Sequence, residues 1–142
     1  MGIKLLLLIL FLVLLIPSIE ANTYLFENST WQNGLTVASW TSIAFGDPDN
    51  DSDLDLAQIG CTSTSGSSCN SYLAKIYMNN GINLTENSTW QGNLTAVHYG
   101  SIAWGDVDND GLLDFVLTGC NDGGGQSSAC NDNGHQSFVY IN

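Results

Sequence analysis

The sequence predicts an all-β protein made of two similar antiparallel four-stranded sheets. Three observations support this fold class: a gapless internal repeat, short apolar segments rich in β-branched and aromatic residues, and turn-forming residues between those segments. No segment after residue 21 sustains the apolar period of a helix. We therefore expect each copy of the repeat to form one small sheet.

The internal repeat covers thirty-five residues in each copy. The first copy reads ENSTWQNGLTVASWTSIAFGDPDNDSDLDLAQIGC (27–61), and the second reads ENSTWQGNLTAVHYGSIAWGDVDNDGLLDFVLTGC (86–120). The offset is 59 residues and twenty positions are identical. The strands expected in the first copy are LTVASW, SIAF, LDLAQI and SYLAKIYM. Two structural units follow, at 22–80 and 81–142.

Residues 1–21 have the layout of a secretory signal peptide. A basic start, MGIK, precedes twelve apolar residues, and the segment closes at a small residue, Ala21. A membrane-spanning helix needs about 20 apolar residues, so an uncleaved anchor is the weaker alternative. We expect a secreted or cell-surface protein.

Acidic residues dominate the charge of the chain. Fourteen Asp and Glu residues stand against two basic residues, and Lys75 is the only basic residue after the leader. Such a chain cannot neutralise phosphates, which excludes a nucleic-acid partner. Nine of the acids lie in two short segments, 47–55 and 106–114. The charge is therefore local and requires a local explanation.

The two acidic segments, DPDNDSDLD and DVDNDGLLD, have the composition of calcium loops. Carboxylates at loop positions one, three, five and nine can turn toward one centre, and the backbone carbonyl at position seven adds another oxygen, as Ca²⁺ requires. Mg²⁺ fits less well because it prefers a strict octahedron. An EF-hand would need Glu at position twelve, where the chain has Gln58 and Leu117. We expect about two Ca²⁺ ions. The predicted ligands are Asp47, Asp49, Asp51, Asp53, Asp55, Asp106, Asp108, Asp110, Leu112 and Asp114.

A small sheet with apolar side chains on both faces needs neighbours. Stacking sheets around an axis produces a β-propeller, which closes with about 4–8 blades. Two blades cannot close a ring, and the chain stops at FVYIN, which corresponds to IYMNN in the first copy. The alternatives are a longer propeller cut short and a short protomer that completes its ring by self-association.

The segments SIAFGDPDNDSDLDLAQIG and SIAWGDVDNDGLLDFVLTG resemble the FG-GAP (VCBS-type) repeat found in integrin α-chain propellers and in many secreted microbial proteins. The resemblance implies propeller blades with Ca²⁺ in each acidic loop. The leading hypothesis for such a chain is an extracellular module for adhesion or ligand binding.

The four cysteines form two local pairs in the repeat. Cys61 and Cys69 bracket one loop, and Cys120 and Cys130 bracket the equivalent loop. Of the three possible connectivities we predict pairing within each loop, because it is local and repeats with the unit. Four N-x-[ST] sequons mark exposed loops of a secreted chain. They begin at Asn28, Asn83, Asn87 and Asn93.

No pattern of catalytic residues is visible. His98 and His135 do not repeat, and no serine lies in a G-x-S-x-G context. We predict packing between blades for the repeated aromatic positions, such as Phe45 and Trp104. Three hypotheses remain: a non-catalytic module that binds an extracellular protein or glycan, an accessory propeller of a secreted carbohydrate-active enzyme, and a truncated remnant.

Overall fold

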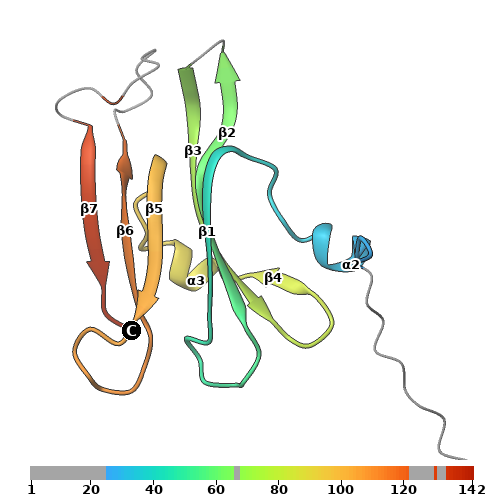
Figure 1. The fold of residues 1–142 in the computed structure, drawn as a ribbon. Coiled ribbons are helices and arrows are strands. Elements are labelled where there is room, and N and C mark those ends of the chain that lie inside the picture. Colours follow the sequence, from blue (N-terminus) through green and yellow to red (C-terminus); the bar gives the residue numbers. More distant parts are fainter. Residues whose placement is uncertain (1–24, 66–67, 122–129, 131–133) are drawn as a thin grey trace, which may run out of the picture.

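The computed structural model describes residues 25–65, 68–121, 130 and 134–142. The predicted signal peptide at 1–21 lies outside these residues. The described chain forms two antiparallel sheets that lie side by side (Figure 1). The first sheet has the order β1-β2-β3-β4 and the second the order β5-β6-β7. The strands are β1 (Ser39–Gly46), β2 (Asp55–Ser65), β3 (Ser68–Asn79), β4 (Leu84–Glu86), β5 (His98–Gly105), β6 (Asp114–Cys120) and β7 (His135–Tyr140).

The all-β prediction is confirmed, but the strands within each unit differ from those expected. The segments LTVASW and SIAF do not form two strands, because β1 runs through Ser39–Gly46 with a register shift between Ser39 and Ser42. The fourth strand of the first sheet is instead β4, which pairs with β3 and lies past the expected unit boundary at residue 80.

Two one-turn helices were not foreseen from the sequence. They are α2 (Ser29–Gln32) and α3 (Ser88–Gln91), both with the sequence STWQ. In each, the preceding asparagine, Asn28 or Asn87, accepts hydrogen bonds from two backbone amides of the first turn. This capping satisfies amides that a helix start leaves without partners. Four residues are too few to show a helical apolar period, so the sequence carries no periodic signal for these two turns.

The main hydrophobic core lies between the two sheets. The first sheet contributes Ala57, Ile59 and Ile76, and the second contributes Ile102, Phe115 and Leu117, each at most 8% exposed. Trp104 also packs there, with its ring centroid 4.8 Å from that of Phe115. A second cluster covers the other face of the first sheet, where α2 lies. It contains Leu56, Tyr77 and Leu84, with Trp31 and Leu35 packed against them.

The same hydrogen bond occurs within each of the two units and shows which of their residues are equivalent. The Tyr77 hydroxyl accepts from the Thr36 amide at 3.0 Å, and the Tyr140 hydroxyl accepts from the Thr95 amide at 2.9 Å. Tyr77 is therefore equivalent to Tyr140, and Asn79 to Asn142. The sequence alignment of FVYIN with IYMNN was wrong by one residue, because the longer loop after Cys120 hides the register.

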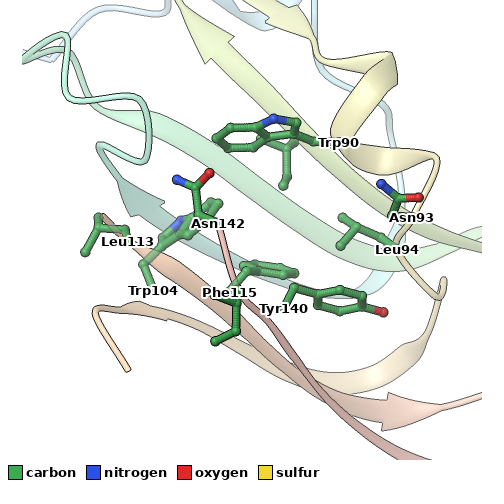
Figure 2. Close-up of a pocket in the computed structure, with 10 residues that line it drawn as sticks. Trp90, Asn93, Leu94, Trp104, Leu113, Phe115, Tyr140 and Asn142 are labelled. Atoms are coloured by element: carbon green, nitrogen blue, oxygen red, sulfur yellow. The ribbon is translucent and has the colours of Figure 1, made fainter. Parts of the chain in front are cut away.

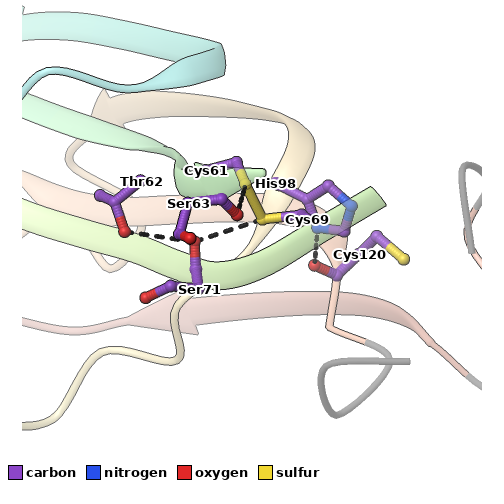
Figure 3. The surroundings of a disulfide bond; sticks show 7 residues. All are labelled: Cys61, Thr62, Ser63, Cys69, Ser71, His98 and Cys120. Carbon is purple, nitrogen blue, oxygen red and sulfur yellow. Dashed lines mark hydrogen bonds between the residues drawn. A yellow bond between two sulfur atoms is a disulfide. The ribbon is translucent and has the colours of Figure 1, made fainter. Parts of the chain in front are cut away.

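Each unit carries one disulfide, Cys61–Cys69 and Cys120–Cys130, the pairs expected from the sequence. Figure 3 shows the first beside His98, whose Nδ1 lies 3.0 Å from the Cys120 carbonyl oxygen. Short-loop disulfides of this kind persist in oxidising compartments. Within the described ranges, no helix is long and apolar enough to span a membrane.

Candidate metal centres

The two acidic loops connect paired strands at the same end of each sheet. Gly46, the last residue of β1, pairs with Asp55, the first residue of β2. Gly105 and Asp114 are paired in the same way between β5 and β6. Antiparallel pairing therefore brings the first and last aspartates of each loop together, although they are eight positions apart in sequence.

Three carboxylates converge in each loop. One oxygen from each of Asp47, Asp49 and Asp55 lies within 4.8 Å of the other two, and Asp106, Asp108 and Asp114 form the same arrangement. Asp55 and Asp114 are buried, whereas Asp49 and Asp108 are exposed. Each triad thus has a fixed buried carboxylate at its base and a solvent-facing carboxylate at its rim.

The remaining predicted ligands lie outside the triads. The Asp51 carboxylate accepts a hydrogen bond from the Asp53 amide at 2.8 Å. Asp110 is placed in the same way and accepts from the Leu112 amide at 2.8 Å. Asp53 and Leu112 were expected to contribute backbone carbonyls rather than side chains, so their side chains are not needed in the triads. The structure therefore brings together three of the four aspartate side chains that were predicted as ligands at loop positions one, three, five and nine.

Backbone amides hold the first aspartate of each loop. Asp47 accepts from the amides of Asp51 at 3.1 Å and Ser52 at 3.0 Å. Asp106 accepts at the same distances from Asp110 and Gly111. The loop turn needs a positive φ at the sixth position, 76° at Ser52 and 93° at Gly111. Glycine adopts this conformation without steric cost, whereas serine is strained there.

The two buried aspartates differ in their hydrogen bonds. Oδ1 of Asp55 accepts from the Asn79 amide at 2.7 Å, and Oδ1 of Asp114 accepts from the Asn142 amide at 3.0 Å. Oδ2 of Asp114 also accepts, from the Val107 amide at 2.7 Å. Oδ2 of Asp55 is buried and has no hydrogen-bond partner.

Proline explains this difference. Pro48 occupies the position of Val107 in the first loop and has no amide hydrogen to donate. A buried acceptor without a partner costs about 1–3 kcal/mol, so such atoms are rare unless an ion or water completes them. The first loop therefore contains an unpaired carboxylate oxygen beside two further carboxylates. This donor set fits a hard cation.

The pKa values of the two buried aspartates move in opposite directions. Burial raises the pKa of Asp55 to about 6, against the hydrogen bond from Asn79, and the neighbouring loop carboxylates add to the rise. The amides of Asn142 and Val107 hold the pKa of Asp114 below its ordinary value, outweighing its burial. A cation in the first loop would favour the charged form of Asp55, which burial alone disfavours.

The other predicted positions have separate surroundings. His98 is buried and stacked on Tyr72, with 4.9 Å between ring centroids, whereas His135 is exposed. Phe45 is exposed although its repeat equivalent Trp104 packs in the core. The sequon residues Asn28 and Asn93 are exposed, and Asn83 and Asn87 are half-buried, so glycosylation stays a prediction.

Comparison with known proteins does not assign the chain to a family. No protein-family model, curated protein or solved structure matches it. The candidate sites rest on the residues and their geometry. Sequence reasoning missed the amides of Asn79 and Asn142 that orient the buried aspartates. It also missed the effect of Pro48, which the repeat alignment shows as a proline opposite Val107.

Proposed function

We propose that the chain is a secreted or cell-surface calcium-binding module of the FG-GAP type, built from propeller blades and non-catalytic. The observation that carries this proposal is the unpaired, buried Oδ2 of Asp55 beside Asp47 and Asp49. A cation there supplies the partner that Pro48 cannot.

Calcium is the cation that this donor set favours. Both triads consist of carboxylates alone, which are hard oxygen ligands. Backbone carbonyls at the seventh loop position and water would complete the coordination. Ca²⁺ accepts six to eight oxygens in flexible geometry, whereas Mg²⁺ demands a near-ideal octahedron. The described triads contain no histidine or cysteine, which zinc sites prefer.

The metal would stabilise the end of each sheet. Each triad joins residues from the end of one strand and the start of the next, so a bound ion ties that hairpin together and offsets the repulsion among its carboxylates. A rigid scaffold of this kind suits a module for adhesion or ligand binding. The loops would present a surface to an extracellular protein or glycan.

Calcium titration by calorimetry tests the proposal. The chelator-treated chain should bind about two Ca²⁺ ions and bind Mg²⁺ more weakly. Calcium should also raise the thermal midpoint by mass action. The absence of both binding heat and a thermal shift would rule out the metal sites.

Single substitutions separate specific binding from attraction to a negative surface. Asp49→Asn and Asp108→Asn should each abolish one site, because each removes a charged member of a triad. Asp53→Asn is the matched control: it removes the same charge from the first loop, but the Asp53 side chain lies outside the triad. Equal losses in Asp49→Asn and Asp53→Asn would show non-specific attraction instead.

A further inference from the structure

An apolar pocket lies beside strand β7 in the second unit. Its volume is about 260 Å³, and Trp90, Leu94, Phe115 and Tyr140 form much of its lining (Figure 2). The equivalent residues of the first unit are Trp31, Leu35, Leu56 and Tyr77. There they surround Leu84 of β4, which is 5% exposed. The pocket is thus the place that a leucine from a fourth strand fills in the first sheet.

The strand edge next to this pocket is also open. In the first sheet, β4 pairs with β3 through Tyr77 with Glu86, Met78 with Thr85 and Asn79 with Leu84. The equivalent strand β7 pairs with β6 and with no other described strand. An open edge presents backbone donors and acceptors that another strand can bind.

The chain contains a second segment with the sequence pattern of β4. Residues 25–28 read LFEN and precede α2, just as residues 84–87 read LTEN and precede α3. In this segment Leu25 and Phe26 are exposed and belong to no strand. Leu25 is therefore the repeat equivalent of Leu84 without the packing that Leu84 has.

The outer faces of the two sheets also carry exposed residues whose repeat equivalents are buried. Ile43 on β1 is 56% exposed, whereas its equivalent Ile102 is 8% exposed in the core between the sheets. Val139 on β7 is 57% exposed, whereas its equivalent Ile76 is 2% exposed in that core. Each exposed face thus corresponds to one of the two faces that pack together inside the molecule.

The space next to two equivalent glycines, Gly46 and Gly105, also fits this stacking of one sheet on another. A Cβ added to Gly46 would lie 2.6 Å from the Trp104 ring, so Gly46 makes room for that ring. The equivalent Gly105 has no atom within 4 Å of such a Cβ. The side chain that corresponds to Trp104 in the first unit is Phe45, which is exposed. The space above Gly105 therefore suits Phe45 of another copy.

The segment 25–27 cannot reach the pocket of its own chain. It leads into α2, which lies against the first sheet, whereas β7 is the outer strand of the second sheet on the opposite side of the molecule (Figure 1). We propose that residues 25–27 of a second copy add as the fourth strand beside β7, with Leu25 in the pocket and the first sheet of that copy stacked on the second sheet of this one.

This contact is head-to-tail, so it continues from copy to copy until a ring closes. The described part of each copy supplies two sheets, so a ring of about 4–8 sheets would need roughly two to four such parts. This inference rests on the proposal that the sheets are propeller blades. It does not require that the chain binds calcium.

Asn93 adjusts the position of the added strand. It stands where the first unit has Gly34, and a Cβ added to Gly34 would lie 2.2 Å from the Leu84 carbonyl oxygen. The added strand must therefore lie farther from α3 than β4 lies from α2. A glycan on Asn93 would block the pocket, so the protein for the test must carry no glycans. It must also be produced in an oxidising compartment, where its two disulfides can form.

Cysteine cross-linking tests the predicted register. The pairing of Met78 with Thr85 predicts that Ile141 of one copy pairs with Phe26 of the next. The double variant Phe26→Cys/Ile141→Cys should therefore form disulfide-linked multimers under mild oxidation. Phe26→Cys/Ser137→Cys, with an exposed partner out of register, is the control and should not. Cross-links within single chains, or equal cross-linking of both variants, would overturn the proposal.

Sedimentation velocity on the full chain tests the contact without cross-links. Leu25→Asp should weaken association at least about tenfold, because it removes a buried leucine and inserts a charge. The control Ile82→Asp changes another exposed apolar residue, in the turn between β3 and β4, and should associate like the wild type. A wild-type chain that stays monomeric, or equal association of both variants, would overturn the proposal. Repeating both experiments in chelator separates strand addition from calcium binding. Association that persists in chelator supports the contact whatever the calcium titration shows, and a failed titration would refute only the metal sites.

Discussion

The backbone amide of Val107 donates a 2.7 Å hydrogen bond to Oδ2 of Asp114. In the first loop the same oxygen of Asp55 has no donor, because Pro48 replaces Val107. Two loops with nearly the same aspartates therefore differ in how well they tolerate the absence of a cation. The first loop depends on a cation more than the second does.

Restoring this donor should stabilise the metal-free protein. Pro48→Ala supplies an amide hydrogen without adding bulk, and satisfying a buried acceptor is worth about 1–3 kcal/mol, less about 0.4–1 kcal/mol for the greater freedom of the unfolded chain. Denaturant unfolding in chelator should show higher stability for the variant. Val107→Pro is the reciprocal control and should destabilise the chain. If neither variant changes the free energy of unfolding, the amide donor does not contribute to stability.

The metal-free protein should become more stable as the pH falls from about 7 to about 5. The pKa of Asp55 is raised to about 6 in the folded chain from an ordinary value of 3.8, so the folded state binds this proton more tightly than the unfolded state. Stability then decreases as pH rises through that window. Asp114 has a lowered pKa, so its contribution has the opposite sign and is lost only at more acidic pH.

Denaturant unfolding across this pH range, in chelator, measures the effect. Asp55→Asn should flatten the profile, because the amide does not titrate there, and Asp114→Asn should retain the rise. A flat wild-type profile would contradict the prediction, and so would a rise that survives in Asp55→Asn.

The sequence repeat was enough to predict two similar β-sheets and the convergence of each acidic loop. Both follow from local patterns: apolar strands on either side of a short loop bring Asp47 near Asp55 whatever the details of packing. The strand β4 could not be foreseen in the same way. It has three residues, and its pairing with β3 depends on Leu84 filling a cluster formed by residues distant in sequence.

The difference between the two candidate sites was equally hidden. Asp55 and Asp114 are identical in the alignment, and their loops share the same spacing. Burial is the main cause of the raised pKa of Asp55, whereas the amides of Asn142 and Val107 lower the pKa of Asp114. The first loop lacks the second of these amides because Pro48 stands opposite Val107, and the importance of that amide depends on where it points in the folded loop. Side-chain patterns carry no direct signal of a backbone donor, so geometry was needed to find it.

Replacing Ser52 by glycine should remove its backbone strain and keep the conformation of the loop. Ser52 has φ of 76°, where the second loop has Gly111 at 93°. Ser52→Gly should stabilise the chain by about 1 kcal/mol, because glycine adopts positive φ without a Cβ clash. The amide that donates to Asp47 is kept.

The reciprocal change provides the control. Gly111→Ser should destabilise the chain by about the same amount, since a Cβ would meet no neighbour there and only the backbone conformation is disfavoured. Thermal unfolding of both variants with and without Ca²⁺ measures the effect. Opposite shifts of similar size are expected, and a loss of stability in Ser52→Gly would show that the serine side chain contributes to the loop in a way that its backbone strain does not reveal.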